Sequence, residues 1–166
     1  MANRITPRTK QEVKRKNRFM LVFPADVGGT LLQASVHASA RPTWKVTDQT
    51  LHYMNTPWYL SGKVTWDTWK CDFYDYVVDN TLKELNKWWK LVYDPSTYLM
   101  KTPDIYKKDV LIYMLGPGLE EDIVETYKLS GTWPMEMSGG DLDMTAMGDV
   151  ISISVTFRYD SIEIVE

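Results

Sequence analysis

The chain has 166 residues, a net charge of −3, 44% hydrophobic residues and 13% aromatic residues. This length suits one domain with a sizeable core, and the apolar content excludes intrinsic disorder for most of the chain. A single cysteine, Cys71, excludes an intrachain disulfide and a Cys-based zinc site.

The charge is distributed unevenly along the chain. Residues 1–18 hold seven Lys or Arg and one acid, giving +6, so the remaining 148 residues carry −9. We predict a basic N-terminal arm at residues 1–17 and a single β domain at residues 18–166. A basic tail can bind nucleic acid, but on this acidic body we favour an arm that lies across an acidic neighbouring subunit. The arm residues assigned to that contact are Arg4, Arg8, Lys10, Lys14, Arg15 and Lys16.

The beginning of the chain has no apolar region of the kind found in signal peptides. No window approaches eighteen uninterrupted apolar residues. We therefore expect neither a signal peptide nor a membrane-spanning helix, and a protein that is soluble when synthesised.

The first half of the chain predicts short strands. Residues 18–24 predict a strand ending at a proline, residues 25–29 a turn, and residues 30–38 a second strand that completes a hairpin. Residues 50–65 predict two strand-like pieces interrupted by a proline and by a Ser-Gly pair. We expect the aromatics beside that proline at the tip of a projecting loop, with a contact surface formed by Pro57, Trp58, Tyr59, Leu60 and Ser61.

A longer strand and a helix follow. Residues 66–77 alternate, with Trp69, Cys71, Phe73 and Val77 on one face and a mixture of aromatics and charges on the other, which is typical of a strand that meets another protein. Apolar residues at helical spacing then predict an amphipathic helix of about fourteen residues, capped by Asp79 or Asn80. Its adjacent tryptophans, Trp88 and Trp89, cannot both point inward. One belongs to the core, and the other is a flank or part of an intersubunit seam.

The last part of the chain predicts a hairpin and a long two-faced strand. Residues 107–115 and 122–133 form the hairpin, which we expect to stop or bend at Gly131-Thr132-Trp133-Pro134. Residues 150–159 alternate strictly, which predicts a strand with one buried face. Its core side is Ile151, Ile153, Val155, Phe157 and Tyr159, and its polar side is Ser152, Ser154, Thr156 and Arg158. We expect the polar side to face a channel or a neighbouring subunit, where Arg158 would meet an acidic partner.

These elements predict a mainly β fold. About seven strands without helices between them pair antiparallel. We therefore expect two packed antiparallel sheets, sandwich-like or barrel-like, with one flanking α-helix.

Residues that could support chemistry are few. His37 and His52 stand outside any cluster with ligand spacing, and His37 reads as a surface histidine. Cys71 reads as a buried, inert thiol. Asp141 and Asp143 could hold a cation, but they lack the rest of a calcium loop, and a solvated turn is favoured. Because nothing combines an acid, a base and a nucleophile, we expect no enzyme activity, no cofactor and no metal.

The order and spacing of several short motifs resemble the tail tube proteins of contractile-tailed bacteriophages, related in fold to the ring protein of type VI secretion. The resemblance covers roughly residues 17–160. Its motifs are Asn17-Arg18-Phe19, Ala40-Arg41-Pro42, residues 50–69, the tryptophan-bearing helix, Tyr106-Lys107-Lys108, Gly131 to Pro134, Asp141-Leu142-Asp143 and Arg158-Tyr159-Asp160. Departures are the basic extension at residues 1–16 and the longer acidic turn at residues 116–122.

The resemblance implies a structural subunit of a virion. Six subunits would close into a ring whose inner sheets join into one barrel, and stacked rings would form the conduit for DNA ejection inside a contractile sheath. Implied partners are the chain itself, the tail sheath, tape-measure, baseplate and tail-terminator proteins, and DNA passing non-specifically through the lumen. Assembly in the host cytoplasm is expected, without a membrane anchor.

Two alternatives stay open at this point. One is a baseplate or tube-initiating ring protein of the same fold, although 166 residues leave little room for an extra domain. The other, from a different class, is a small β-barrel enzyme or nucleic-acid-binding protein that uses the basic arm.

Overall fold

A computed structural model describes residues 12–165, apart from the side chains of residues 119–121. Its strands are β1 (Phe19–Val22), β2 (Val36–Ser39), β3 (Trp44–Tyr53), β4 (Thr56–Trp66), β5 (Trp69–Tyr74), β6 (Tyr93–Asp94), β7 (Leu99–Met100), β8 (Lys108–Gly116), β9 (Leu119–Ser138), β10 (Ser152–Arg158) and β11 (Ser161–Val165). Its helices are η1 (Ala25–Val27, a 3-10 turn), α1 (Gly29–Ser35), α2 (Thr81–Val92) and α3 (Pro103–Tyr106). None of the helices in this part of the chain is long and apolar enough to span a membrane.

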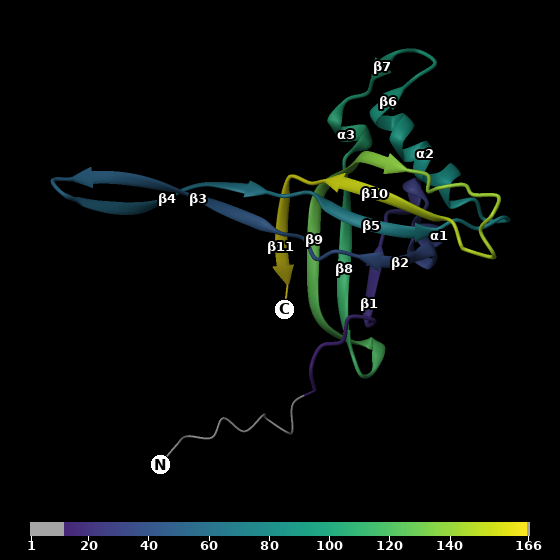
Figure 1. Ribbon diagram of the computed structural model, residues 1–166, viewed down its shortest axis with the longest axis horizontal. Helices are drawn as coiled ribbons and strands as arrows, with labels where there is room; N and C mark the ends of the chain where they lie inside the picture. Colours follow the sequence, from purple (N-terminus) through teal and green to yellow (C-terminus); the bar gives the residue numbers. More distant parts are fainter. Residues whose placement is uncertain (1–11, 166) are drawn as a thin grey trace.

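Two layers of antiparallel strands make up the body, and β9 belongs to both (Figure 1). The first part of β9 lies between β8 and β11, whereas its last part pairs with β10. The strand order β1-β8-β9-β10-β5-β2 therefore folds over at β9, and β1, β8 and β11 run across β10, β5 and β2. The predicted fold of packed antiparallel sheets with one main flanking helix, α2, is confirmed.

The core lies between these layers and is dominated by aromatic rings. Phe23 is at its centre, with its ring centroid 6.0–6.4 Å from those of Trp69, Phe73, Trp88 and Phe157. One of these pairs is stacked, two are tilted and one is edge-on, and aromatic pairs at these separations add to the free energy gained from apolar burial. The core therefore joins β5, β10, α2 and the segment after β1.

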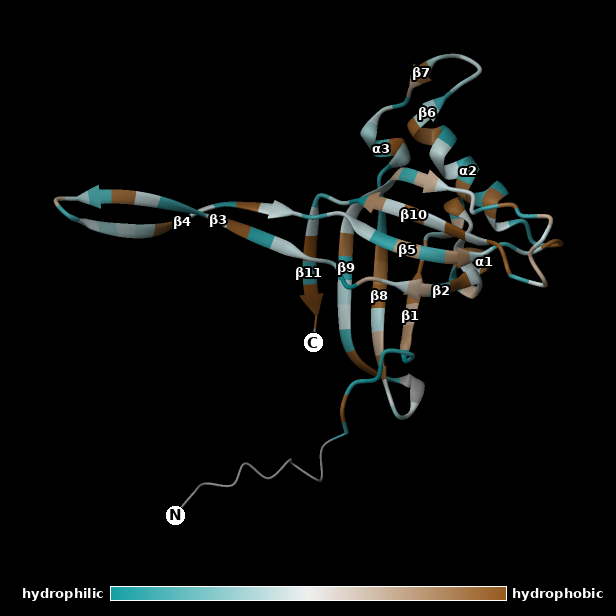
Figure 2. Ribbon diagram, viewed as in Figure 1, coloured by the Kyte–Doolittle hydropathy of each residue, from teal (hydrophilic) through white to brown (hydrophobic). Residues whose placement is uncertain are grey.

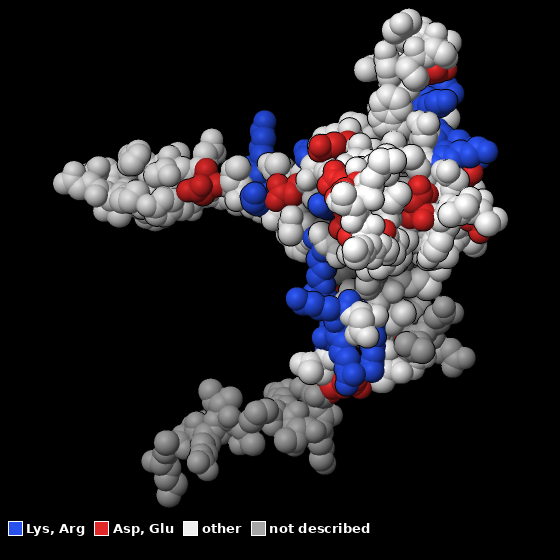
Figure 3. All heavy atoms as spheres, turned by 45° about the vertical axis from the view of Figure 1, so that its right-hand side comes forward, with Lys and Arg blue, Asp and Glu red and all other residues white. Residues whose placement is uncertain are grey.

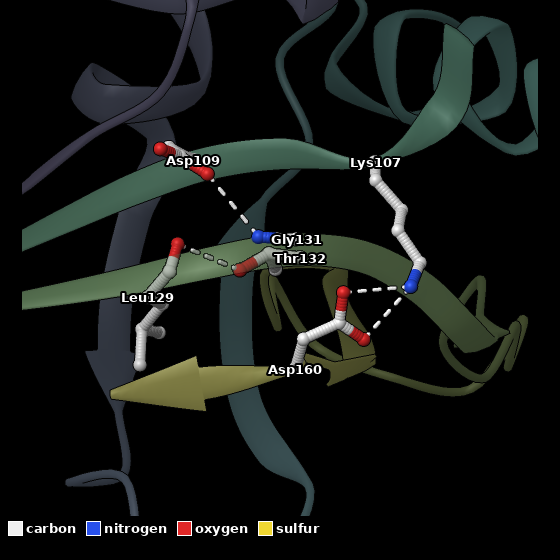
Figure 4. A network of polar contacts seen from close by, with 6 residues as sticks. All are labelled: Lys107, Asp109, Leu129, Gly131, Thr132 and Asp160. Atoms are coloured by element: carbon white, nitrogen blue, oxygen red, sulfur yellow. Dashed lines mark hydrogen bonds and ion pairs between the residues drawn. The ribbon is translucent and has the colours of Figure 1, made fainter. Parts of the chain in front are cut away.

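The strand was expected to stop or bend at residues 131–134, and it bends: β9 continues to Ser138 but changes its partner from β8 to β10. Gly131 has φ +66, and its amide donates to Asp109 Oδ1 over 3.1 Å (Figure 4). A Cβ at this position would lie 2.3 Å from Asp160 Oδ2, whose carboxylate also binds Lys107 Nζ. Pro134 faces a register shift in β10, beyond the last residue paired with β8. A proline without an amide hydrogen is tolerated at such an irregular edge, so the chain changes sheet here without ending the strand.

The alternation predicted at the end of the chain is confirmed for β10. Ile153, Val155 and Phe157 are fully buried, and Tyr159 just beyond the strand is nearly so. Ile151 is the exception, since it precedes the first paired residue of β10 and is 39% exposed.

The segment after β1 differs from the prediction of a second strand at residues 30–38. Residues 30–35 instead belong to helix α1. The helix starts after Gly28, whose φ of +105 lies in the left-handed region, and it buries Leu32 completely. Ser35 closes the helix by donating its hydroxyl to the Leu31 carbonyl over 2.8 Å. Only Val36–Ser39 becomes a strand, and it pairs with β5, while β1 pairs with β8. The predicted hairpin at residues 18–38 is therefore wrong.

Helix α2 is confirmed, and the cap is Asn80, whose Oδ1 accepts from the Lys83 amide over 2.6 Å. Trp88 is the buried member of the tryptophan pair and donates Nε1–H to the Tyr106 carbonyl over 2.9 Å. Trp89 is partly exposed and meets the Tyr93 ring edge-on. One member of the pair thus belongs to the core, as predicted, and the other lies at the surface of the chain.

The remaining strand predictions are mostly confirmed. β8 and β9 form the expected hairpin. In β5 the predicted inward residues Trp69, Cys71 and Phe73 are fully buried, but Val77 is fully exposed because the strand ends at Tyr74. The predicted loop at residues 94–103 contains the small β6–β7 pair.

Candidate assembly surfaces

The most prominent feature of the surface is a hairpin arm formed by β3 and β4 (Figure 1). Every residue of β3 is exposed, and so is every residue of β4 except Trp66. The arm therefore extends away from the body without packing on another layer. Its strands are held by their own ladder, which closes at the pair of Tyr53 with Thr56.

The predicted projecting loop is part of this arm, but it is a strand. Pro57 to Ser61 lie in β4, where Trp58 faces Leu51 and Tyr59 faces Thr50. The turn is at residues 54–55, with Met54 at φ 54. A proline fits because a two-stranded ribbon leaves one edge of each strand unpaired. The exposure expected for Trp58 and Tyr59 is present, at 63% and 67%.

A bulge near the middle of the arm explains the Ser-Gly pair. The register shifts between Val46 and Asp48, so that Thr47 on β3 lies opposite two residues of β4, Gly62 and Lys63. The hydroxyl of Thr47 accepts from the Lys63 amide over 3.0 Å and donates to the Lys63 carbonyl over 3.1 Å. Because a Cβ on Gly62 would lie 2.6 Å from that hydroxyl, the glycine makes room for the bulge.

Apolar side chains on the β3–β4 arm are left uncovered by the part of the chain that the structure describes. Hydrophobic residues appear as brown bands along both strands (Figure 2). The members are Trp44, Val46, Leu51, Tyr53, Met54, Trp58, Tyr59, Leu60 and Val64, each at least 46% exposed. Isolated two-stranded hairpins are marginally stable in water, and large exposed apolar patches mark interaction sites. The arm has the properties of an element that is completed by a partner.

The polar face predicted for the last strand is half-buried within the chain itself. Ser152, Ser154, Thr156 and Arg158 all have intermediate exposure. Ser154 donates its hydroxyl to Asp72 of the neighbouring strand, and Lys70 Nζ lies 3.9 Å from the same carboxylate. This face is thus part of a charged surface shared by β5 and β10. Among the described residues, Arg158 forms no ion pair.

The structure describes only part of the predicted basic N-terminal arm at residues 1–17. Arg4, Arg8 and Lys10 lie outside the described residues. Lys14, Arg15 and Lys16 line a cavity of about 560 Å³ together with Phe19, Ser39, Ala40, Arg41, Ile112 and Met114. Lys and Arg side chains gather on this side of the molecule, below the body in Figure 3.

One acidic residue organises this basic region. Lys14 Nζ binds the Glu125 carboxylate, Arg41 Nη2 lies 3.7 Å from it, and the Tyr127 hydroxyl donates to it. The hydrogen bonds from Lys14 and Tyr127 hold the pKa of Glu125 below its usual range. Neither Arg41 nor Glu125 was among the predicted site residues. The only sequence signal for them was Arg41 within the Ala-Arg-Pro motif.

The candidate chemical residues lie apart. Cys71 is fully buried, and this burial raises the pKa of its thiol. His37, expected at the surface, is half-buried: its Nδ1 is buried, and its ring stacks on Tyr74 at 4.2 Å. His52 lies on the exposed arm opposite Pro57. Asp143 accepts from the amide and hydroxyl of Thr145, as in a solvated turn.

Comparison with known proteins identifies the class of fold. The chain has the fold of tube and tube-cap proteins of contractile injection systems. The predicted resemblance to tail tube proteins is thus confirmed at the level of the fold. No protein-family model and no curated protein matches the chain.

The solved structures similar to this chain have low sequence identity. A chain of the anti-feeding prophage cap, the tube terminating cap, has TM-score 0.72 and 12% identity, with 99% of each chain covered. A chain of the sheath/tube terminator of the PVC extracellular contractile injection system has TM-score 0.71 and 10% identity, covering 95% of this chain and 99% of the other. The anti-feeding prophage baseplate contains one with TM-score 0.70 and 12% identity, covering 93% and 97%. A type six secretion system protein is more distant, with TM-score 0.51, 7% identity and coverage of 88% and 81%.

Proposed function

We propose that this chain is a structural subunit of the tube of a contractile, phage-type tail or injection particle. Subunits would close into six-membered rings, and stacked rings would form a conduit inside a contractile sheath. The shared fold supports this role, and so do the surfaces that the isolated subunit leaves uncovered.

The observation that carries the proposal is the β3–β4 arm. Its nine exposed apolar side chains lie on a ribbon that nothing else in residues 12–165 covers. A monomer gains nothing from such an arm, because it bears the cost of the hydrated apolar surface without the benefit of a core. A polymer of identical subunits gives every arm the same partner surface. The arm is therefore best explained as a contact element between copies.

The sheet edges support closure into a ring. β1 and β11 lie at opposite edges of the layer that contains β8 and the first part of β9. Ile164 and Val165 on β11 are 45% and 48% exposed. Unpaired edges invite association, and a barrel shared among subunits would remove them.

The rest of the proposal concerns partners and cargo. The subunit would contact a sheath, a tape-measure protein, a baseplate and a terminator, and would act as a structural wall without catalytic activity. An acidic body suits a conduit for DNA, since like charge weakens the binding of phosphate to the wall. The tube would be assembled in the host cytoplasm and belong to the released particle.

A second candidate is a ring at an end of the tube. Similarity to chains from a tube terminating cap and from a baseplate favours it. Such a protein would form a ring of the same fold but would not add further copies of itself.

Electron microscopy of the purified full chain at rising concentration tests both candidates. Six-fold rings that grow into hollow tubes are expected for the tube subunit. Rings that never stack would favour the cap or baseplate role. A monomer that persists in sedimentation at the highest concentration would contradict both.

A further inference from the structure

The cavity beside the N-terminal segment has a basic rim and an apolar floor. Its volume is about 560 Å³. The rim carries Lys14, Arg15, Lys16 and Arg41, whereas the floor is formed by Phe19 of β1 and by Ile112 and Met114 of β8. A site with this composition fits a segment that combines carboxylates with flexible apolar side chains.

Cations on the rim exceed the carboxylates next to them. Lys14 and Arg41 share the one carboxylate of Glu125, and Arg15 lies 3.6 Å from Glu12, which also binds Arg18. Among the described residues, four cations thus line the cavity beside two carboxylates, one of which also pairs with Arg18. The surplus positive charge favours an acidic occupant and would steer it toward the cavity.

The connection between β9 and β10, residues 139–151, has the complementary composition. It contains Asp141, Asp143 and Asp149 and no Lys or Arg. Its apolar side chains project into solvent: Leu142 is 86% exposed, Met144 106%, Met147 100% and Val150 66%. Methionine side chains are flexible and adapt to irregular apolar surfaces. The connection therefore offers acidic groups and uncovered apolar groups in one short segment.

The cavity and the connection occupy different parts of the surface. The connection lies at the end of the body remote from the β3–β4 arm, whereas the cavity lies where the N-terminal segment meets β1 and β8 (Figure 1). A contact between two different patches of identical subunits is heterologous. Such contacts repeat from copy to copy and generate closed rings or open helical stacks.

We propose that residues 139–151 of one copy dock into the basic-rimmed cavity of the next copy. Asp141 and Asp149 pair with the rim, and the exposed methionines cover the Phe19 side of the floor. The occupant is a second copy because the chain itself supplies both complementary surfaces. This inference rests on the proposed self-assembly and specifies one of its contacts.

Charge reversal on both sides tests the contact. The variants are D141K/D149K on the connection, K16E/R41E on the rim, and the four substitutions combined. Asp143 is left unchanged because its carboxylate holds the turn at Thr145. Each pair alone should raise the concentration needed for half-maximal assembly by roughly tenfold or more, since it places like charges together. The combined variant should recover to within about threefold of the wild type, because the ion pairs are restored with reversed sign.

The controls separate a lost contact from a lost fold. D79K/D104K makes the same change in net charge at exposed positions on other elements and should assemble like the wild type. Circular dichroism melting curves should show that D141K/D149K, which alters only exposed residues, folds normally. Normal assembly of that variant, or no recovery in the combined variant, would overturn the docking while leaving the proposed function intact. A wild-type chain that never assembles would instead refute the proposed function.

Thiol crosslinking provides a direct readout. Cys71 is fully buried, so K16C/M144C presents two accessible thiols and the wild type presents none. A short bis-maleimide should convert assembled K16C/M144C into a ladder of covalent oligomers on denaturing gels. After the same treatment, K16C alone and M144C alone should run as uncrosslinked monomers on the denaturing gel. A double variant that assembles but gives no ladder would show that the two surfaces do not meet.

Discussion

Tyr159 donates its phenolic O–H to the carbonyl oxygen of Thr43 over 2.7 Å, and this bond joins the end of β10 to the root of the β3–β4 arm. The ring of Tyr159 is buried in the core, so one end of the bond is fixed by packing. Asp67 strengthens the same root, since its amide donates to the Thr43 carbonyl over 3.1 Å and its carboxylate lies 3.2 Å from Lys45 Nζ. The direction of the arm is thus set where it leaves the body.

Tyr159→Phe should therefore lower the stability of the folded chain and remove one of the bonds that fix the root of the β3–β4 arm. Loss of one intramolecular hydrogen bond should lower the free energy of unfolding by about 1 kcal/mol. Urea denaturation followed by tryptophan fluorescence measures this change. The matched control is Tyr98→Phe, because Tyr98 is 79% exposed. Equal stabilities for the two variants would contradict a structural role for the bond.

Trp58→Ser combined with Tyr59→Ser should impair assembly while leaving the fold of the chain intact. Both side chains are more than 60% exposed, so the melting temperature of the subunit should change little. Loss of their apolar area from a contact should nevertheless shorten the tubes or prevent them from forming. Tyr98→Ser combined with Leu99→Ser alters comparably exposed residues on the β6–β7 hairpin and serves as control. Tubes of normal length in the arm variant would exclude these two aromatics from the contact.

Asn80→Ala should destabilise α2 from its first turn. The substitution leaves the Lys83 amide without the acceptor that now lies 2.6 Å away, and loss of such a cap costs about 1 kcal/mol. Because α2 carries Trp88 into the core, the loss should appear in global unfolding. Asn80→Asp keeps an acceptor at the same position and should retain most of the stability. A destabilised Asp variant would indicate that Asn80 acts through another contact.

The Glu125 cluster should make stability depend on pH in the acidic range. Its hydrogen bonds hold the pKa of Glu125 below the usual value in the folded state, so folding favours the carboxylate. This contribution is fully present above the ordinary glutamate pKa and is lost as the pH falls through the lower, folded-state pKa. Glu125→Gln should reduce the stability at neutral pH and flatten the decline below the ordinary pKa. Parallel urea titrations of both proteins measure the difference, and curves of identical shape would refute the assignment.

The local elements that the sequence predicted well are those in which local pattern and tertiary packing agree. Strict alternation at residues 153–159 and the Asn80-capped helix each match one periodicity, and both appear as expected. The segment at residues 30–38 was ambiguous, because Leu31, Leu32, Ala34 and Val36 fit a short helix as well as a strand. The segment forms helix α1, in which Leu32 is buried in the core.

The candidate site was predicted only in part, for a related reason. Trp58 and Tyr59 were recognised as exposed, but Pro57 suggested a loop where the edge of a free ribbon tolerates a proline within a strand. The basic-rimmed cavity could not be predicted, because Lys14, Arg41 and Glu125 are far apart in the chain. Pairing of β8 with β9 and the path from β2 into the arm bring them together.

By itself, the sequence determined which residues are buried in β5 and β10, the capped helix and the antiparallel β class, since these follow from side-chain periodicity. The sequence also marked Gly131 to Pro134 as a place where the strand stops or bends. Only the tertiary structure decided that β9 continues there from one layer into the other, and that β3 and β4 leave the body as an arm. Both outcomes depend on contacts between residues distant in sequence, such as Gly131 with Asp109 and Tyr159 with Thr43. Local pattern carries no information about such contacts, because they form only when the layers meet.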